Sequence, residues 1–487
     1  MHKPQFFNLV FTMTTLLTTI LLGSGCSVNP ATGNKQFDGL MSREAEASVG
    51  ASEHEKIVKE YGGLYQNQNV QAYVNAIGQK IAKNTERSEV SYKFFVLDSP
   101  IVNAFAMPGG FVYITRGLMA VANDEAELAA VIAHEIGHVT GRHSAARYSS
   151  GMLTQLGATV LSAAVGRADV SRAVGLGSNL YMSSYSREQE HEADMLGVRY
   201  LARAGYDTMA MSDFLNNMER YQQAESRAVG KAGSNTPSYF SSHPPTPERV
   251  GKSVAEAGRY EVSQKRNRAE YQAVIAGMIY GGGTKDGFVR DNVFYHPALG
   301  FQFTVPQGYK IDNQAKQVVA TGADGGIIVF DRASSQSSTP ESYMANEWLA
   351  GKMNVAPETI NVNGLPAAAA GFEGSIGGKS ARIQMVAISW SPRDIYRFQM
   401  AIPVGASAQT IDNLKRTTYS FRQMSEEEKG RIREQRIELV RAGAGDSVES
   451  IAAQMNVPSD RVARFLALNG LSSGERLVTG QVYKIVG

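Results

Sequence analysis

The spacing of apolar and polar residues divides this chain of 487 residues into parts of different kinds. Up to about residue 283, most apolar positions recur every three to four residues, as in Val70 to Lys83, which predicts amphipathic helices. Only short runs are typical of strands, chiefly Phe94 to Leu97 and Phe111 to Thr115. The pattern therefore predicts a mainly α-helical first domain, residues 41–283, with a small β-sheet.

After about Arg290 the pattern changes to that of a second domain, residues 290–424, which mixes strands and helices. The predicted strands are Phe294 to Val305, Gln317 to Val319, Ile327 to Phe330, Ile383 to Trp390 and Tyr396 to Ile402, and the predicted helices are Met344 to Met353 and Gln409 to Thr417. The end of this domain resembles small α/β sandwich domains. It carries no catalytic constellation, and its role stays open.

Residues 438–487 follow a charged stretch and show the order strand, helix, helix, strand. Three features resemble a LysM domain, a glycan-binding module: the opening Gly445-Asp446-Ser447, Asn469 after the second helix, and the ending Gly480-Gln481 with Lys484-Ile485. The resemblance implies that this part binds peptidoglycan. A small cap without a ligand would show the same pattern, because a fold does not determine a function. The whole chain is thus predicted to be a multidomain α+β protein.

The first 25 residues carry a different pattern again. Lys3 is followed by the uncharged apolar stretch Phe6 to Leu22, then by the small residues Gly23-Ser24-Gly25 and by Cys26, the only cysteine. This predicts a lipoprotein-type signal peptide, residues 1–25, a lipid on Cys26 and a tether over residues 26–40. The predicted location is the periplasmic side of the cell envelope, anchored in the outer membrane. A plain signal peptide or an uncleaved anchor helix remains an alternative, because Gly23 stands where such signals usually have leucine.

The overall charge balance adds one exclusion. The 48 Lys and Arg residues nearly cancel the 46 Asp and Glu residues, so nothing in the composition favours a nucleic-acid partner. Met152 to Val165 is uncharged, but it is shorter than the roughly 20 apolar residues that cross a membrane, and it predicts a buried or interfacial helix.

Candidate chemistry is concentrated in His134-Glu135-Ile136-Gly137-His138, inside a predicted helix from Asp124 to Arg142. Histidines at i and i+4 project from one helix face, so both imidazoles can reach one Zn²⁺ at about 2.0–2.1 Å. Glu135 points into the same space and can take a proton from water there. The flanking residues are apolar, and a buried polar cluster needs partners, which a metal would supply. The motif predicts a zinc peptidase.

A catalytic zinc usually has three protein ligands, so the third ligand distinguishes the families of peptidase. One family would require histidine at position 144, which is Ser144; His143 is one residue too early and is interpreted as a polar residue at the helix end. A second predicted helix, Ser186 to Ala204, offers Glu190 as the ligand. Asp194 lies one turn further on the same face and can accept a hydrogen bond from a ligand histidine. Glu188, His191 and Glu192 lie on other faces and are interpreted as solvated.

Four ordered motifs resemble the HtpX-like and CAAX-prenyl-protease-like gluzincin peptidases of family M48, in particular their soluble, BepA-like periplasmic branch. The motifs are Asn103 to Gly110, the HEIGH helix, Ser186 to Glu190 with Ala193-Asp194, and Ser242-His243-Pro244-Pro245 with Glu248-Arg249. The resemblance implies a zincin fold over about residues 40–260.

The resemblance also implies roles for individual residues. His134, His138 and Glu190 would be the zinc ligands, Glu135 the general base and Asp194 the carboxylate behind the site, with Arg249 in a supporting role. His243 would lie by the metal, either stabilising the oxyanion or occupying the open coordination position as a plug. The edge strand that pairs with the substrate backbone would comprise Gly110, Phe111, Val112, Tyr113 and Ile114.

The sequence therefore predicts a zinc metalloendopeptidase that hydrolyses unfolded or misassembled envelope proteins. The stretch Gln222 to Ser242, rich in Ser, Gly and Asn, is predicted to be a mobile loop that gates access. Two alternatives stay open: an outer-membrane assembly factor whose site is latched by His243 and rarely cleaves, and a lipoprotein whose main role is to bind peptidoglycan.

Overall fold

The computed structural model describes residues 26–152, 184–229, 239–314, 316–350, 355–376, 379–457 and 460–487. The predicted signal peptide lies outside these residues, as does the predicted helix Met152 to Val165 beyond its first residue. Within the described residues, no helix is both long enough and apolar enough to cross a membrane.

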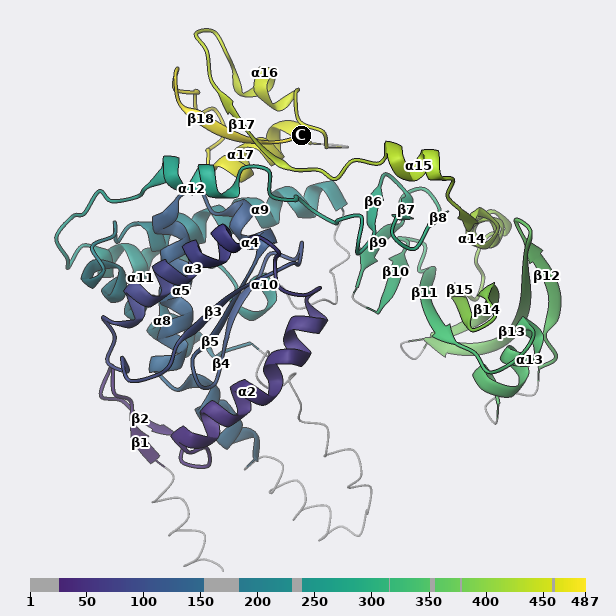
Figure 1. Ribbon diagram of the computed structural model, residues 1–487, viewed down its shortest axis with the longest axis horizontal. Coiled ribbons are helices and arrows are strands. Elements are labelled where there is room, and N and C mark those ends of the chain that lie inside the picture. Colours follow the sequence, from purple (N-terminus) through teal and green to yellow (C-terminus); the bar gives the residue numbers. More distant parts are fainter. Residues whose placement is uncertain are drawn as a thin grey trace, which may run out of the picture.

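The first domain is mainly helical around one small sheet, as predicted (Figure 1). The sheet has the order β3-β5-β4, in which β3 runs parallel and β4 antiparallel to the central β5. The strands of the first domain are the hairpin β1 (Cys26–Val28) and β2 (Lys35–Phe37), β3 (Lys93–Leu97), β4 (Ala104–Met107) and β5 (Phe111–Thr115). Its helices are α2 (Arg43–Glu60), α3 (Gln68–Ala82), α4 (Arg116–Val121), α5 (Glu125–Thr140), α8 (Arg187–Arg203), α9 (Ala210–Val229), α10 (Tyr239–Ser242), α11 (Pro247–Ala257) and α12 (Arg268–Ile275).

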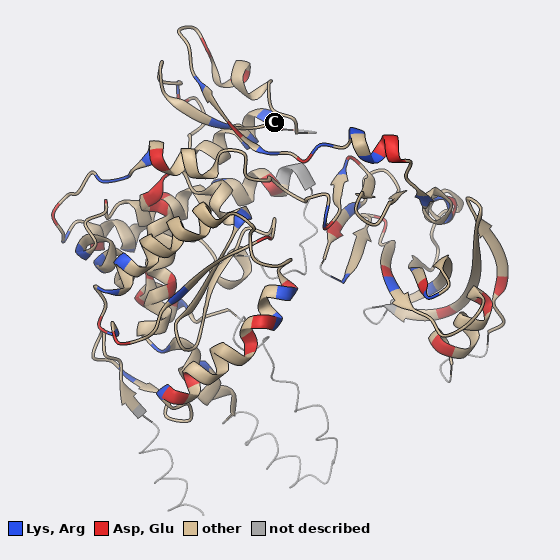
Figure 2. Cartoon of the chain, in the orientation of Figure 1, with Lys and Arg blue, Asp and Glu red and all other residues tan. Residues whose placement is uncertain are grey.

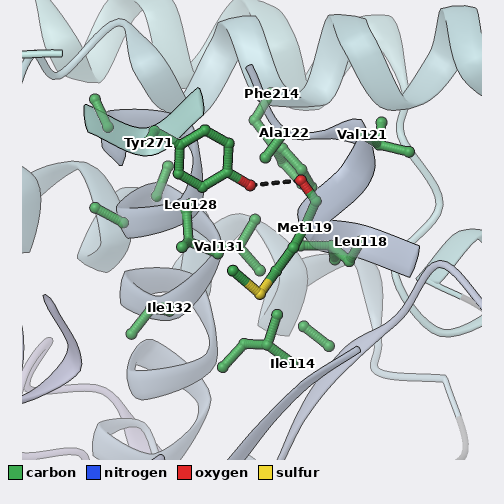
Figure 3. Packing of buried hydrophobic residues seen from close by; sticks show 14 of the residues in the cluster. Ile114, Leu118, Met119, Val121, Ala122, Leu128, Val131, Ile132, Phe214 and Tyr271 are labelled. Carbon is green, nitrogen blue, oxygen red and sulfur yellow. Dashed lines mark hydrogen bonds between the residues drawn. The ribbon is translucent and has the colours of Figure 1, made fainter. Parts of the chain in front are cut away.

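The core of this domain forms where α4, α5, α9 and α12 meet (Figure 3). Leu128, Val131 and Ile132 of α5 pack there against Met119 of α4 and are fully buried. The Tyr271 hydroxyl donates a hydrogen bond to the carbonyl of Met119. Helix α5 is therefore held rigidly in the centre of the domain, where burial of its aliphatic side chains stabilises it by about 1.5–3 kcal/mol each.

The segment after Cys26 differs from the predicted tether. Asn29 and Asp38 are buried, and Arg142, just behind α5, donates hydrogen bonds to the Asp38 carboxylate and to the carbonyl of Met41. β1 and β2 pair as an antiparallel hairpin. Turn-forming residues gave this stretch the composition of a linker, but its polar side chains are bound by the first domain.

The second domain is built on two antiparallel sheets, with orders β16-β8-β7-β6 and β12-β13-β14-β15-β11-β10-β9. Side chains of both sheets and of α14 share one core, so the α+β prediction is confirmed. Its elements are β6 (Phe288–Arg290), β7 (Val293–His296), β8 (Phe301–Thr304), β9 (Lys310–Asn313), β10 (Gln317–Thr321), β11 (Ile327–Ser334), α13 (Pro340–Tyr343), η2 (Met344–Trp348), β12 (Glu358–Val362), β13 (Leu365–Ile376), β14 (Lys379–Ser391), β15 (Asp394–Pro403), α14 (Ala408–Ser420) and β16 (Arg422–Gln423). The charged helix α15 (Glu426–Arg431) then leads back towards the first domain (Figure 2).

The remaining elements are β17 (Ile437–Arg441), α16 (Val448–Ala452), α17 (Arg461–Asn469) and β18 (Val482–Val486), with β17 antiparallel to β18. This is the predicted strand, helix, helix, strand order. Ile451, Phe465 and Tyr483 belong to the same hydrophobic core as the helices of the first domain. The Lys484 ammonium donates hydrogen bonds to the carbonyls of Ala120, Val121 and Ala122 at 2.8, 3.2 and 2.7 Å. The unit is packed onto α4 instead of hanging from a linker.

Candidate metal centre

Helix α5 places His134, Glu135 and His138 in the domain interior. Asp124 caps its first turn, because the carboxylate accepts a hydrogen bond from the amide of Glu127 at 2.9 Å. All sixteen residues of the helix are buried. The two histidines lie one turn apart on the same face, as the i, i+4 spacing predicts.

Helix α8 approaches α5 closely through two glycines. A Cβ atom at Gly137 would lie 3.0 Å from the carbonyl oxygen of Ala193, and one at Gly197 would lie 3.2 Å from the backbone nitrogen of His134. Larger residues would hold the helices apart. This contact brings Glu190 and Asp194 of α8 to the histidines of α5, as predicted.

Four buried side chains converge on one point: His134, His138, Glu190 and His243 offer ligand atoms that all lie within 4.8 Å of one another. The Nε2 atoms of His134 and His138 are 3.1 Å apart. Glu190 Oε1 lies 3.4 Å from His138 Nε2, and its Oε2 lies 3.6 Å from His134 Nε2. The three predicted ligands therefore share a site on which a single ion could bind.

Asp194 and Arg249 lie behind this cluster. Asp194 Oδ1 is 2.9 Å from His134 Nδ1, the ring nitrogen that faces away from the cluster. The Arg249 guanidinium donates two hydrogen bonds to the Asp194 carboxylate at 2.7 Å each, and it lies 2.9 Å from Glu190 Oε2. A buried cation thus compensates one of the two negative charges of the buried carboxylates, and Asp194 orients His134.

The pKa shifts of Glu190 and His138 favour the forms that bind a metal, whereas at His134 burial, which lowers the pKa, is outweighed by the hydrogen bond to Asp194 and the charge of Glu190, which raise it. Burial would raise the pKa of Glu190, but His243, His138 and His134 hold it well below its ordinary value, so the carboxylate is ionised. Burial lowers the pKa of His138 well below its ordinary value, so this imidazole is neutral. Neutral imidazole and carboxylate are the forms that bind zinc. The donor set therefore fits the ion that the motif predicts.

The surroundings of Glu135 suit a proton acceptor. Its side chain is fully buried, and neither carboxylate oxygen has a hydrogen-bond partner among the residues that the structure describes. Burial raises the pKa of Glu135, while His243, His134 and the backbone of Ala106 in β4 counteract this rise. A carboxylate with a raised pKa and vacant acceptor sites can take a proton from a water molecule beside it.

His243 reaches the cluster from the end of α10. Its Nδ1 lies 2.8 Å from Glu190 Oε1, and its Nε2 lies 3.6 Å from Glu135 Oε1. Tyr239 stacks on its ring at 4.9 Å and is held by a hydrogen bond from its amide to the carbonyl of Val102.

The predicted loop Gln222 to Ser242 is wrong at both ends, because α9 runs to Val229 and α10 begins at Tyr239. Residues 230–238 lie outside the described part.

The predicted edge strand is also wrong. β5 pairs with β3 through Lys93↔Phe111 to Leu97↔Thr115 and with β4 through Ala104↔Ile114 to Met107↔Phe111. Gly110, Phe111, Val112, Tyr113 and Ile114 are thus at or in the central strand, whose backbone groups are already shared with two neighbours. β4 is an edge strand among the described strands and packs against α5.

The sequence interpretation missed two residues beside the cluster. The sequence pattern predicts that His143 is a polar residue at a helix end and that Glu192 is solvated. In the structure, His143 Nδ1 lies 2.8 Å from His138 Nδ1, and its Nε2 lies 3.5 Å from Glu192 Oε1. Tyr185 stacks on the His138 ring at 3.7 Å. His143 supplies no ligand atom to the cluster, which agrees with its exclusion as the third ligand.

Comparison with known proteins agrees with this geometry. Residues 68–256, which contain every residue of the cluster, match the family model described as Peptidase family M48. The matched part of the chain, residues 68–256, is thus similar to peptidase family M48. The resemblance predicted from the four motifs is confirmed, because all four motifs lie within this part of the chain.

Three relatives show the range of this family. The chain is 31% identical over 217 residues to a putative beta-barrel assembly-enhancing protease of Vibrio cholerae, covering 42% of this chain and 43% of the relative. It is 34% identical over 155 residues to the beta-barrel assembly-enhancing protease of Escherichia coli strain K12, covering 30% and 32%. It is 28% identical over 228 residues to the mitochondrial metalloendopeptidase OMA1 of Schizosaccharomyces pombe, covering 46% and 64%. The matches thus span less than half of the two bacterial relatives.

Proposed function

We propose that this chain is a zinc-dependent metalloendopeptidase of the bacterial cell envelope that hydrolyses unfolded or misassembled envelope proteins. The observation that carries the proposal is the buried cluster of His134, His138 and Glu190, with an unpartnered Glu135 beside it. The printed names of the relatives, an assembly-enhancing protease and a metalloendopeptidase, support the same activity.

His134, His138 and Glu190 would hold the ion. When bound, Zn²⁺ supplies Lewis acidity, which polarises the scissile carbonyl and makes a nearby water more acidic. Glu135 accepts the proton of the attacking water and returns it to the leaving amine. Asp194 keeps His134 in the orientation needed for binding through Nε2. His243, once displaced from Glu190, is close enough to Glu135 to donate a hydrogen bond to the developing oxyanion.

The substrate backbone would add to β4 and not to β5. β4 has a free edge among the described strands, and the backbone of its residue Ala106 approaches Glu135. An extended peptide bound there by main-chain hydrogen bonds would pass the general base, with little dependence on its side chains. Such recognition suits unfolded polypeptides.

Zinc analysis and a casein-cleavage assay test the proposal on the full chain. Glu135→Gln should keep one equivalent of zinc and the wild-type melting temperature, while proteolysis falls by at least a hundredfold. Glu188→Gln, at an exposed residue of α8, is the matched control and should keep full activity. Full activity of Glu135→Gln, or a wild-type protein that binds no zinc, would contradict the proposal.

A second candidate function is an outer-membrane assembly factor whose proteolysis is latched. Two observations favour it: His243 lies 3.2 Å from His134 Nε2 and 2.8 Å from Glu190, and the side chains of the cluster are at most 4% exposed. His243 would then occupy the position that a substrate needs. His243→Ala should raise casein cleavage and autolysis several-fold if a protease is latched. No cleavage by either form would favour the assembly factor.

Envelope attachment rests on the two ends of the sequence. A lipid on Cys26 would anchor the protein in the outer membrane, and radiolabelled palmitate should be incorporated into the wild type but not into Cys26→Ser. Residues 438–487 would bind peptidoglycan, supported by their strand, helix, helix, strand order. Purified sacculi should retain the protein, and soluble glycan fragments should release it; a protein that stays in the supernatant would contradict this part.

A further inference from the structure

His138 is supported from behind by a second histidine. Its Nε2 faces the cluster, while its Nδ1 lies 2.8 Å from His143 Nδ1. An imidazole that binds a metal through Nε2 carries its proton on Nδ1 and donates it to a neighbour. His143 is placed to accept this proton, in the position that Asp194 occupies for His134.

The geometry at the end of α5 sets the position of His143. A Cβ atom at Gly141 would lie 2.5 Å from His143 Nε2, so only glycine leaves room for the ring to fold back on the helix. Arg142 has a positive φ of 53°, which reverses the chain at this point. Its side chain is bound to Asp38 and Glu46, which fixes the reversal. The strained backbone at Arg142 thus places the next residue, His143, which is 1% exposed, against the metal ligand His138.

The contact continues to the segment that follows Cys26. His143 Nε2 lies 3.5 Å from Glu192 Oε1, and the same oxygen accepts hydrogen bonds from Asn29 Nδ2 and from Thr32 Oγ1. When His138 carries its proton on Nδ1, it can donate to His143, and His143 can donate to Glu192, which also accepts from Asn29 and Thr32.

The segment around Asn29 is itself held in one conformation. Asn29 is 1% exposed, its Oδ1 accepts a hydrogen bond from the amide of Ala31, and its amide donates one to the carbonyl of Asn34. Arg199 of α8 donates a hydrogen bond to the carbonyl of Ala31. The turn therefore presents Asn29 and Thr32 to Glu192 as a preformed unit.

We propose that His143 and Glu192 are positioning residues for the metal ligand His138, and that the turn Asn29 to Asn34 is their outermost support. Binding of the segment that follows Cys26 to Glu192 would thereby determine the metal affinity of the site. The inference rests on the proposed function, because it requires that His134, His138 and Glu190 bind a metal. It adds residues outside the M48 match, since Asn29 precedes residue 68.

Metal affinity and the absorption spectrum of the cobalt-substituted protein test this directly. His143→Ala and Glu192→Ala should each weaken Zn²⁺ binding by about 10–100-fold in competition with a chromophoric chelator, and they should shift the visible Co²⁺ bands. Asn29→Ala should weaken binding in the same direction. Glu192→Gln, which keeps an acceptor, should lie between Glu192→Ala and wild type. His191→Ala, at the neighbouring histidine of α8, is the control and should bind zinc as wild type does.

The double variant separates a connected series from independent contacts. If His143 and Glu192 act through one another, His143→Ala with Glu192→Ala should lose little more affinity than either alone. Should His143→Ala fail to fold, Glu192→Ala carries the test, because that side chain is 16% exposed. Wild-type affinity and spectrum in Glu192→Ala would overturn the proposal and leave the proposed function intact. A wild-type protein that binds no Zn²⁺ or Co²⁺ would instead overturn the proposed function.

Discussion

Arg249 binds Asp194 with two hydrogen bonds of 2.7 Å, from Nε and from Nη2, and both side chains are buried. Breaking such a pair by removing one partner costs about 3–5 kcal/mol, because the other charge is left uncompensated. Arg249→Met should therefore lower the free energy of unfolding by this amount and weaken zinc binding by about 10–100-fold through His134. Denaturant unfolding and chelator competition measure the two effects.

Arg249→Lys is the informative control for this pair. Lysine keeps the charge but cannot form the bidentate contact. Arg249→Lys should therefore affect the free energy of unfolding less than it affects zinc affinity. If Arg249→Met unfolds with the wild-type midpoint and binds zinc equally well, Asp194 does not depend on Arg249.

The close packing of α5 on α8 makes a second prediction. Gly137→Ala places a methyl group 3.0 Å from the carbonyl of Ala193, so α8 must shift away and carry Glu190 with it. We expect a loss of about 1–3 kcal/mol in stability and a weaker metal site. Gly251→Ala, in α11 with nothing within 4 Å, should leave zinc binding unchanged and stabilise the helix slightly. Thermal melts with and without zinc compare the two; equal behaviour would contradict the packing argument.

Lys484 makes a third prediction, on how the β17–β18 unit is attached. Burial lowers the pKa of its ammonium to about 7, and its three acceptors are the carbonyls of Ala120, Val121 and Ala122 behind α4. Lys484→Met leaves these carbonyls without their donor, at a cost of about 1–3 kcal/mol for each buried group left unsatisfied. Hydrogen exchange should then rise in α4 as well as in β18. Lys415→Met, at an exposed residue of α14, should change neither.

A fourth prediction concerns pH and the second domain. Burial lowers the pKa of His296 to about 4, and its Nδ1 accepts a hydrogen bond from the amide of Leu299, which requires the neutral ring. Between pH 6.5 and 4 the unfolded state therefore binds more protons than the folded state, so stability is complete above pH 6.5 and falls as the pH is lowered. The loss should approach about 3 kcal/mol.

Tryptophan fluorescence measures this effect on its own domain, because the two tryptophans of the chain, Trp348 and Trp390, both lie there. His296→Asn keeps an acceptor for Leu299 and does not titrate in this range, so its urea midpoint should change much less from pH 7 to pH 4.5. An equal acid sensitivity in His296→Asn would assign the effect to other groups.

The sequence predicted the centre of the site well, because its chemistry is local. The i, i+4 spacing in α5 and in α8 is a property of a helix, so His134 with His138 and Glu190 with Asp194 could each be placed on one face without a structure. The strand Phe111–Thr115, rich in aromatic and β-branched residues, was located with both bounds correct, whereas Phe294 to Val305, predicted as one strand, is divided into β7 and β8. These predictions needed no knowledge of how distant segments meet.

What failed depends on contacts between distant residues. β13 was not predicted, since Ala and Gly have weak strand preferences, and only pairing with β12 and β14 makes Ala367 and Ala368 part of a buried strand. The sequence also could not show that β4 lies outside β5, because strand order is not encoded in the pattern of one strand. His143 and Glu192 were misjudged because the sequence pattern does not show their partners. His143 contacts His138, 5 residues away across a reversed turn, and Glu192 contacts Asn29, 163 residues away in sequence.

The shared core of the first domain with β17, α16, α17 and β18 has a consequence for how the protein folds. The side chains that close this core, among them Ile437, Phe465 and Tyr483, follow the helices of the first domain only after the whole second domain, residues 290–424. Chains fold as they are delivered, beginning at the N-terminus. The helices that carry the cluster of His134, His138 and Glu190 are therefore fully covered only when residues 437–486, which are synthesised later, have folded onto them.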